Sequence, residues 1–180
     1  SDTSPQCLPC AGDFVVETVE ELASIKQCAS ISGNLTISSH TLRDLAILEE
    51  TQCLTTIYAN LSITANPSLT NVDGLTSLQE IHGNLTLHLN WVLANTEGLA
   101  NLQNIGGRIQ ISSNEALPSL LGLSQLITAT DDLEIQGNSA LLNLDTLAKL
   151  ENVAGSLNIS DNASLASLSG LKKLILVGKD

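Results

Sequence analysis

The chain has 180 residues, of which 43% are hydrophobic and only 2% aromatic, which suits one domain whose core is filled by aliphatic side chains. Its formal net charge of −12 disfavours binding to nucleic acids and anionic lipid surfaces, because neither offers counter-charge to an acidic protein. No apolar run approaches the roughly 20 residues that a membrane-spanning helix needs, so no transmembrane segment is expected.

Residues 1–30 are predicted to form a disulfide-fastened cap. The chain begins Ser-Asp-Thr-Ser and contains no methionine, as a secreted protein does after its leader is removed, although trimming of the sequence gives the same start. Four cysteines, Cys7, Cys10, Cys28 and Cys53, predict two disulfides formed in an oxidising compartment. A zinc site is disfavoured because Cys28 and Cys53 are not a second closely spaced pair, and a redox site because Cys7 and Cys10 do not open a helix.

A short amphipathic helix is predicted within this cap. Val15, Val19, Leu22 and Ile25 form a helical stripe, and the segment Thr18 to Glu21 has the pattern of a capping box. An open end of a stacked-coil protein exposes core leucines and unpaired strand edges, so this helix is expected to cover the N-terminal end.

Residues 31–180 are built from a repeat. Six apolar residues open its successive copies, at one interval of 26 residues and then intervals of 24: Ile31, Ile57, Ile81, Ile105, Ala129 and Val153. Alternating apolar residues follow, as in Leu85 and Leu87, which is the periodicity of a strand. Leucines then recur every third residue with glycines among them, which favours short turns over an α-helix.

These patterns predict an all-β solenoid of about six 24-residue coils, with residues 31–180 as repeats and residues 1–30 as the cap of a single domain. Each coil is expected to contribute one strand to one continuous parallel sheet. Val177 begins a seventh coil that the sequence does not finish.

An asparagine recurs at one position of the successive coils: Asn66, Asn90, Asn114, Asn138 and Asn162. His40 takes this position in the first coil. Stacked asparagine side chains can hydrogen-bond to the backbone along the rod, and asparagine tolerates the left-handed conformation of a corner. The pattern therefore predicts a structural ladder and no catalytic role.

The start of the sequence resembles the receptor L-domain family. The resemblance rests on a cysteine, an amphipathic helix, a second cysteine and a strand: Cys10, residues 15–26, Cys28 and Ile31-Ser-Gly-Asn-Leu-Thr-Ile37. It extends through the coils to about Gly178. Leucine-rich repeats are the nearest alternative, but they place the strand leucine three residues after the preceding apolar corner, whereas Ile81 and Leu85 are four apart.

The resemblance implies a right-handed parallel β-helix, a secreted or cell-surface location, and a role in binding or in organising a cell wall. The family includes the ligand-binding lobes of insulin and epidermal-growth-factor receptors and fungal glycosylphosphatidylinositol-anchored wall glycoproteins. It also implies a disulfide between Cys10 and Cys28 that brackets the helix, with Cys7 and Cys53 as the second. A bond between Cys28 and Cys53 across adjacent coils is the alternative pairing.

Glycosylation motifs predict five N-glycan acceptors if the source is eukaryotic: Asn34, Asn60, Asn84, Asn158 and Asn162. Three of them share one repeat position, where Asn-Leu-Thr is also the strand consensus. The alternative is therefore that the motif is structural and carries no sugar.

Candidate catalytic and metal-binding groups are dispersed. His82 and His88 are expected on the outward face of one strand, ~20 Å apart at about 3.3 Å per residue, too far to share a metal ion or a proton. Asp131, Asp132 and Glu134 crowd one strand, where a solvated acidic face is favoured over a cation site. No Ser-His-Asp arrangement emerges from the repeat. The expectation is a protein without enzyme activity, metal or cofactor.

A ligand site is predicted on the parallel sheet around the second to fourth coils, where the scarce large side chains gather: Tyr58, His82, His88 and Trp91. Interfaces favour such residues. Tyr58 and His82 share a repeat position and are expected side by side, although Tyr58 covering an edge and Trp91 filling a gap is the simpler interpretation. The predicted function is extracellular recognition of a protein or glycan. The alternative is a structural subunit of a wall, matrix or filament that stacks on copies of itself, end to end or laterally.

Overall fold

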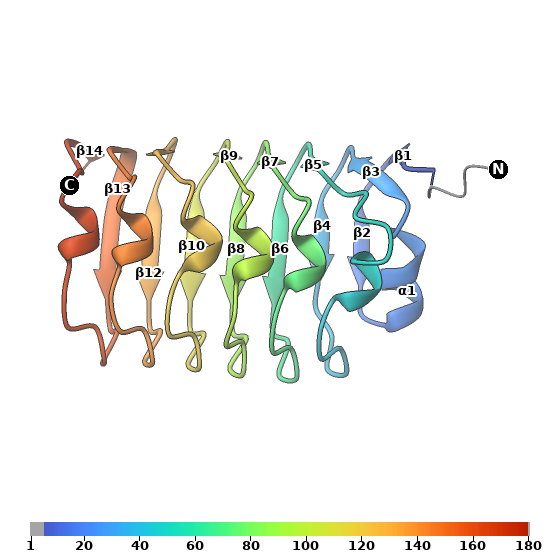
Figure 1. The fold of residues 1–180 in the computed structure, drawn as a ribbon, viewed down its shortest axis with the longest axis horizontal. Helices are drawn as coiled ribbons and strands as arrows, with labels where there is room; N and C mark the ends of the chain where they lie inside the picture. The colour runs from blue at the N-terminus through green and yellow to red at the C-terminus, as the bar shows by residue number, and fades with distance from the viewer. Residues whose placement is uncertain (1–5, 180) are drawn as a thin grey trace.

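The computed structural model describes residues 6–179 and shows a rod of stacked coils with the two ends of the chain at opposite ends of the rod (Figure 1). A typical coil contains a two-residue strand, a corner, a longer strand and a single turn of 3-10 helix. Strands of successive coils pair in parallel. The architecture is therefore a β-rich solenoid, as the repeat predicts.

The first strands of successive coils form a five-stranded parallel sheet in the order β1-β3-β5-β7-β9. Its members are β1 (Leu8–Cys10), β3 (Cys28–Ile31), β5 (Thr56–Ile57), β7 (Glu80–Ile81) and β9 (Asn104–Ile105). The next strand at this position, β11 (Thr128–Ala129), pairs with β13 (Asn152–Ser160) and not with β9. The row of first strands is thus interrupted between the fourth and fifth coils.

The second strands form the nine-stranded parallel sheet, in which β13 also joins β11. Its remaining members are β2 (Phe14–Val16), β4 (Leu35–Ile37), β6 (Leu61–Thr64), β8 (Leu85–His88), β10 (Ile109–Ser112) and β12 (Leu133–Gln136). Register follows the 24-residue period, since Leu85 lies between Leu61 and Ile109. Strand β14 (Leu176–Lys179) pairs with β13.

The prediction of one strand per coil and one continuous sheet is wrong. A corner separates the two strands of most coils, as at Gly83 between β7 and β8. A Cβ on Gly83 would lie 2.7 Å from the carbonyl oxygen of Ala59 and 2.4 Å from Oδ1 of Asn60. The corners of successive coils therefore stack in close contact, which turns the chain between two short strands.

The leucine-rich half of each coil forms the third side of the rod. It contains one short 3-10 helix per coil: η1 (Ala46–Leu48), η2 (Asp73–Leu75), η3 (Glu97–Leu99), η4 (Leu121–Leu123), η5 (Asp145–Leu147) and η6 (Ser169–Leu171). Leucines three residues apart point inward, and Leu99 and Leu102 are 1% and 2% exposed. The prediction of turns in place of α-helices is confirmed.

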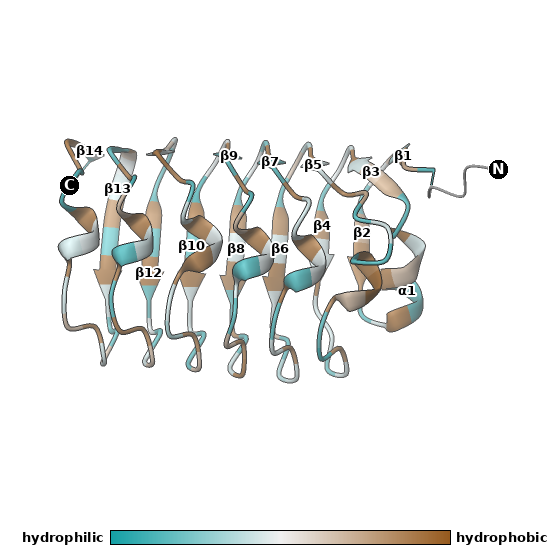
Figure 2. Cartoon of the chain, in the orientation of Figure 1, coloured by the Kyte–Doolittle hydropathy of each residue, from teal (hydrophilic) through white to brown (hydrophobic). Residues whose placement is uncertain are grey.

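Aliphatic side chains fill the interior in layers. Leu85 and Leu87 of β8 are 0% and 1% exposed, whereas Thr86 between them faces outward. Hydrophobic residues recur at the same level of successive coils, which aligns the layers along the rod (Figure 2). Such burial is the main source of stability in a stack whose coils contact only their neighbours.

The repeated asparagines form a buried ladder. Nδ2 of Asn90 donates to the carbonyl oxygen of Ile63 at 2.9 Å and to Oδ1 of Asn114 at 3.1 Å, while Oδ1 of Asn90 accepts from Nδ2 of Asn66 at 2.9 Å. Asn66, Asn90, Asn114 and Asn138 are each 0% exposed. The ladder thus satisfies backbone groups inside the rod that water does not reach.

Two details of the ladder differ from prediction. The first coil uses Ser39 and not His40, since the Ser39 backbone N–H donates to Oδ1 of Asn66 at 2.7 Å and His40 is exposed. The left-handed conformation belongs to the residue before each asparagine: Ala65, Leu89, Ser113, Gly137 and Asp161. The asparagines therefore supply hydrogen bonds and their neighbours supply the sharp turn.

The helix of the N-terminal region is shorter than predicted. Helix α1 spans Val19–Ser24 at the N-terminal end of the rod (Figure 1), and Thr18 and Glu21 form the expected capping box. The pKa of Glu21 is lowered because the Glu17 backbone N–H, and secondarily Thr18, donate to its carboxylate. Val15 lies on strand β2, and Val15 and Val19 are each more than half exposed, so the buried stripe reduces to Leu22 and Ile25.

Two disulfides fasten this region to the coils. Cys10 is bonded to Cys28, and Cys7 to Cys53, the two pairs that the family resemblance implied. The alternative bond between Cys28 and Cys53 is therefore wrong. The first bond spans 18 residues and brackets α1, and the second spans 46 residues and reaches the start of the second coil.

Replacing Cys10 and Cys28 together by serine is expected to lower the free energy of unfolding by about 2–3 kcal/mol, because the bond restricts the unfolded chain. Urea denaturation under non-reducing conditions measures this. The variant Cys7→Ser/Cys53→Ser is the matched comparison and is expected to lose at least as much, since its loop is longer. An unchanged urea midpoint in the first variant would contradict the prediction.

Candidate functional site

A second ladder of polar side chains runs along the corner between the two sheets. The backbone N–H of Asn60 donates to Oδ1 of Asn34 at 3.1 Å, that of Asn84 to Oδ1 of Asn60 at 2.7 Å, and that of Arg108 to Oδ1 of Asn84 at 2.8 Å. Asp13 begins the series by accepting from the backbone N–H of Asn34. Sequence reasoning missed this ladder because it treated these asparagines only as glycan acceptors or as part of the strand consensus.

This corner ladder stops between the fourth and fifth coils. Arg108 occupies the asparagine position and offers no acceptor to the next coil, and the series resumes only where Oδ1 of Asp132 accepts from the Ser156 backbone N–H at 2.8 Å. Asp131 also replaces the glycine found at this corner in Gly83, Gly107 and Gly155. The two changes coincide with the missing pairing of β9 and β11.

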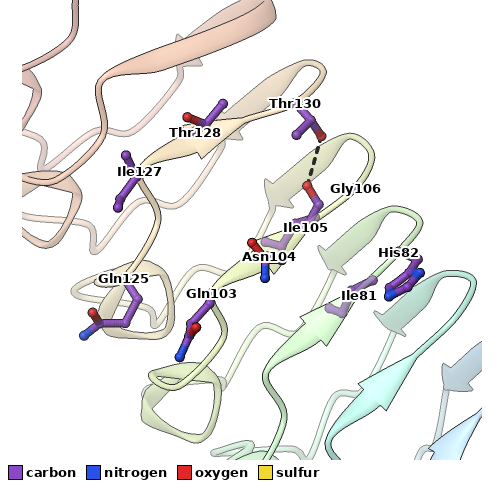
Figure 3. A pocket seen from close by; sticks show the side chains of 10 residues that line it. All are labelled: Ile81, His82, Gln103, Asn104, Ile105, Gly106, Gln125, Ile127, Thr128 and Thr130. Carbon is purple, nitrogen blue, oxygen red and sulfur yellow. Dashed lines mark hydrogen bonds between the residues drawn. The ribbon is translucent and has the colours of Figure 1, made fainter.

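A groove of about 650 Å³ opens at this interruption, over the ends of β7, β9 and β11 (Figure 3). Residues that line it include His82, Gln103, Asn104, Gln125, Ile127 and Thr130. Within the groove, Oγ1 of Thr130 donates to the carbonyl oxygen of Ile105 at 2.9 Å, the dashed line in Figure 3. A side-chain hydroxyl thus takes the place of a backbone donor at the gap.

Tyr58 and His82 lie side by side at one end of this region, as predicted. Their ring centroids are 4.8 Å apart with planes at 69°, an edge-to-face contact. Tyr58 is 54% exposed, and Nε2 of His82 lies 3.4 Å from a carboxylate oxygen of Glu80. His82 also lines the groove, so the ring pair and the groove form one continuous surface.

His88 and Trp91 do not join this pair. His88 lies on β8 in the nine-stranded sheet, and its Nδ1 is 2.8 Å from Oγ of Ser112. Trp91 follows the buried Asn90 on a turn and is 46% exposed. The prediction that His82 and His88 share one strand is wrong, because the chain turns a corner between them. The four residues therefore divide between two faces.

The acidic residues of the fifth coil have separate roles. Glu134 forms an ion pair with Arg108 and accepts from Nε2 of Gln110 at 3.1 Å, while Asp132 accepts a backbone bond from Ser156. Within residues 6–179, no group of three or more His, Cys, Asp or Glu side chains is placed to hold a metal ion. No helix in the same range is long and apolar enough to cross a bilayer.

The five predicted glycan acceptors differ in accessibility. Asn84 and Asn158 have exposed side chains. The other three already use Nδ2 as a donor. Asn34 donates to Asp13, Asn60 donates to Asn34, and Asn162 donates to the backbone carbonyl of Ile135. Glycosylation stays a prediction for a eukaryotic source, and we expect it first at the two exposed acceptors.

Comparison with known families decides the affiliation of this fold. The model of the receptor L domain matches residues 27–126, more than half of the sequence. The chain belongs to the receptor L-domain family. The match includes strands β3 to β10, the Tyr58–His82 pair and the β9 side of the groove. No curated protein and no solved structure shows significant similarity to this L domain. Family membership indicates an extracellular ligand-binding module, in agreement with the two disulfides.

Proposed function

We propose that this L domain is a secreted or cell-surface recognition module that binds a protein or glycan through the exposed face of the five-stranded sheet. The observation that carries the proposal is the Tyr58–His82 pair, two rings in contact on a face where a ligand reaches both. Aromatic side chains contribute large contact areas at low entropic cost, so they dominate many interfaces.

The proposal assigns the chain no catalytic role, metal or cofactor. Most polar side chains near the corner are committed to the two ladders, where they bond to the backbone of the next coil. A hydrogen-bonding network of this kind positions coils. It does not direct a nucleophile and a base toward a common reacting atom.

We also infer that the solenoid winds right-handed through six coils and that α1 closes its N-terminal end. Family membership supports the handedness, and the position of α1 beside β2 and η1 supports the cap.

Alanine substitution tests the binding face. The purified chain is screened against a panel of secreted ectodomains and a glycan array, and each binder is measured again with Tyr58→Ala and with His82→Ala. We expect at least a tenfold loss of affinity in both variants, because each ring supports the other. Gln136→Ala on the nine-stranded sheet is the control and is expected to bind as the unmodified protein does. Binders that retain full affinity for both ring variants, with the fold intact, would contradict the proposal.

A structural role in assembly is the second candidate, and the C-terminal end of the rod supports it. Ile175 is 81% exposed, and the neighbouring Leu176 and Val177 are also exposed, as are Lys172 and Lys173. The opposite end carries exposed acidic residues around α1, Glu17, Glu20 and Glu21. Apolar contact and opposite charge would then both favour end-to-end stacking.

Sedimentation velocity over a range of concentrations separates the two functions. Assembly predicts linear oligomers that grow with concentration and shorten with added salt, because screening weakens the attraction between the two ends. Lys172→Glu/Lys173→Glu is expected to reduce this growth. A single monomeric species at all concentrations would exclude the structural role for this chain.

A further inference from the structure

We propose that the groove between the fourth and fifth coils is a binding site for a neutral oligosaccharide. This inference rests on the proposed recognition function and specifies its ligand class and its position. The observation behind it is that, within the described residues, the row of first strands is interrupted at one place, between β9 and β11.

The interruption leaves backbone groups without partners inside the protein. In the fourth coil, the N–H groups of Gln103, Asn104 and Gly106 donate to carbonyl oxygens of the third coil at 2.9, 3.3 and 2.8 Å. The corresponding N–H groups in the fifth coil belong to residues 127, 128 and 130, and none of them donates to the fourth coil. Only the Thr130 hydroxyl crosses the gap. The groove therefore presents backbone donors and acceptors that remain available to a ligand.

Two substitutions in the repeat account for the gap. Asp131 places a Cβ at a corner where glycine permits close stacking, since a Cβ on Gly155 at the same position would lie 2.6 Å from the backbone nitrogen of Asp132. Ala59 also has a Cβ there, yet its coil stays paired because the Asn34–Asn60 bond holds the corner. The fifth coil has both the bulkier corner residue and Arg108 in place of the asparagine acceptor, so both contacts are lost.

The chemistry of the lining selects a neutral, hydroxyl-rich ligand. The ten lining residues carry amide, hydroxyl, imidazole or aliphatic side chains or are glycine, and none is an acid, a lysine or an arginine, in a chain with a net charge of −12. Side-chain amides both donate and accept, as sugar hydroxyls do. Nδ2 of Asn104 donates to Glu80 and Oε1 of Gln125 accepts from Lys149, so these two amides keep part of their capacity for a ligand, and Gln103 has no side-chain partner within the described residues. Two charged groups lie at the margin of this lining, where Glu80 contacts His82 and Asn104 and Lys149 donates to Gln125, so the charges that border the groove are of opposite sign and both already have partners.

Shape and apolar surface agree with a sugar. Ile127 is 53% exposed in the groove and offers an aliphatic patch to the C–H face of a sugar ring. The groove is open to solvent, its volume of about 650 Å³ is comparable to that of small-ligand sites, and the Tyr58–His82 pair adjoins one end. An extended peptide would have to pair along the whole edge of β9, but the carbonyl oxygen of Ile105 already accepts from the Thr130 hydroxyl, so the oligosaccharide is favoured.

The test titrates the isotope-labelled protein with neutral oligosaccharides of two to six units, covering β-linked glucans, chitin fragments and mannans, followed by amide chemical shifts. We expect at least one class to bind and to shift the resonances of residues 103–106 and 127–130. The variant Arg108→Asn/Asp131→Gly restores the repeat, closes the gap and is expected to weaken this binding at least tenfold. Gln103→Ala removes one exposed amide from the groove and is expected to weaken binding without affecting the fold.

Gln79→Ala is the matched control, because Gln79 is exposed at the same repeat position one coil earlier and does not line this groove. It is expected to leave binding unchanged. Absence of binding by every oligosaccharide, or equal binding by the repaired and unmodified proteins, overturns the proposal. If no oligosaccharide binds but a protein ligand needs Tyr58 and binds the repaired variant normally, the groove proposal fails while the proposed recognition function stands. Oligosaccharide binding that survives Tyr58→Ala but not repair supports the groove and contradicts the ring-centred face.

Discussion

Replacing Gly98 with alanine is expected to destabilise the fold by about 4 kcal/mol or more. Gly98 lies in η3, and a Cβ there would be 1.8 Å from the carbonyl oxygen and 2.4 Å from the carbonyl carbon of Val72. Those atoms belong to the backbone of the adjacent coil, so relief requires the two coils to separate. Thermal and urea denaturation followed by far-ultraviolet circular dichroism measure the loss.

Gly137→Ala is the matched control for this prediction. Gly137 has a positive φ of 67°, but the nearest atom to its Cβ would be 3.6 Å away. Only backbone strain opposes this alanine, at a cost of about 1–2 kcal/mol. If Gly98→Ala and Gly137→Ala lowered the free energy of unfolding equally, contact between coils would not be the reason that glycine is required at position 98.

Asn90→Ala is expected to cost about 3–4 kcal/mol, because several buried groups lose their partners together. The carbonyl oxygen of Ile63 and Oδ1 of Asn114 lose a donor, and the backbone N–H of Asn66 loses its acceptor. Asn90 is 0% exposed, so water does not replace these bonds without opening the rod. Chemical denaturation gives the change in the free energy of unfolding.

Asn162→Ala provides the comparison at the end of the same ladder. Its Nδ2 donates to the carbonyl oxygen of Ile135 at 2.9 Å and its Oδ1 accepts from the backbone N–H of Asn138 at 3.0 Å, but these bonds and the Asn162 side chain are only partly buried. Water can therefore satisfy the groups left behind, and we expect a loss of about 1 kcal/mol. The account of the ladder fails if Asn90→Ala is no more costly than Asn162→Ala.

The repeat pattern predicted the elements that follow directly from periodicity. Intervals of 24 residues gave the strand register, as between Leu61 and Leu85, and leucines three apart gave turns in place of helices. Both depend on local spacing, because each coil contacts only its neighbours. The family resemblance supplied the two disulfide pairs, which spacing alone left open.

Features that depend on contacts between corners were not predicted. The chain turns between Ile81 and Leu85, and this turn divides one expected strand between two sheets and separates His82 from His88. The turn is held by Asn84 and Asn60 side chains, whose bonds to the next coil leave no trace in hydrophobic periodicity. In the first coil the donor to Asn66 is Ser39, 27 residues earlier, although the 26-residue register of β4 and β6 points to His40.

The groove was missed for a related reason. The groove arises because two contacts of the repeat are missing: Arg108 supplies no acceptor to the next coil, and Asp131 replaces the corner glycine. Sequence reasoning assigned Asp131 to a solvated acidic face. Departures from the repeat at stacking corners are the signal that locates such a gap.

Amide hydrogen exchange of the unmodified protein tests the interruption most directly. The N–H groups of residues 127, 128 and 130 are expected to exchange much faster than those of Gln103, Asn104 and Gly106, which are bonded to the preceding coil at the same repeat positions. The Arg108→Asn/Asp131→Gly variant is expected to slow the first group to the rate of the second. Equal protection of the two groups in the unmodified protein would mean that β11 pairs with β9, and the proposed ligand groove would not exist.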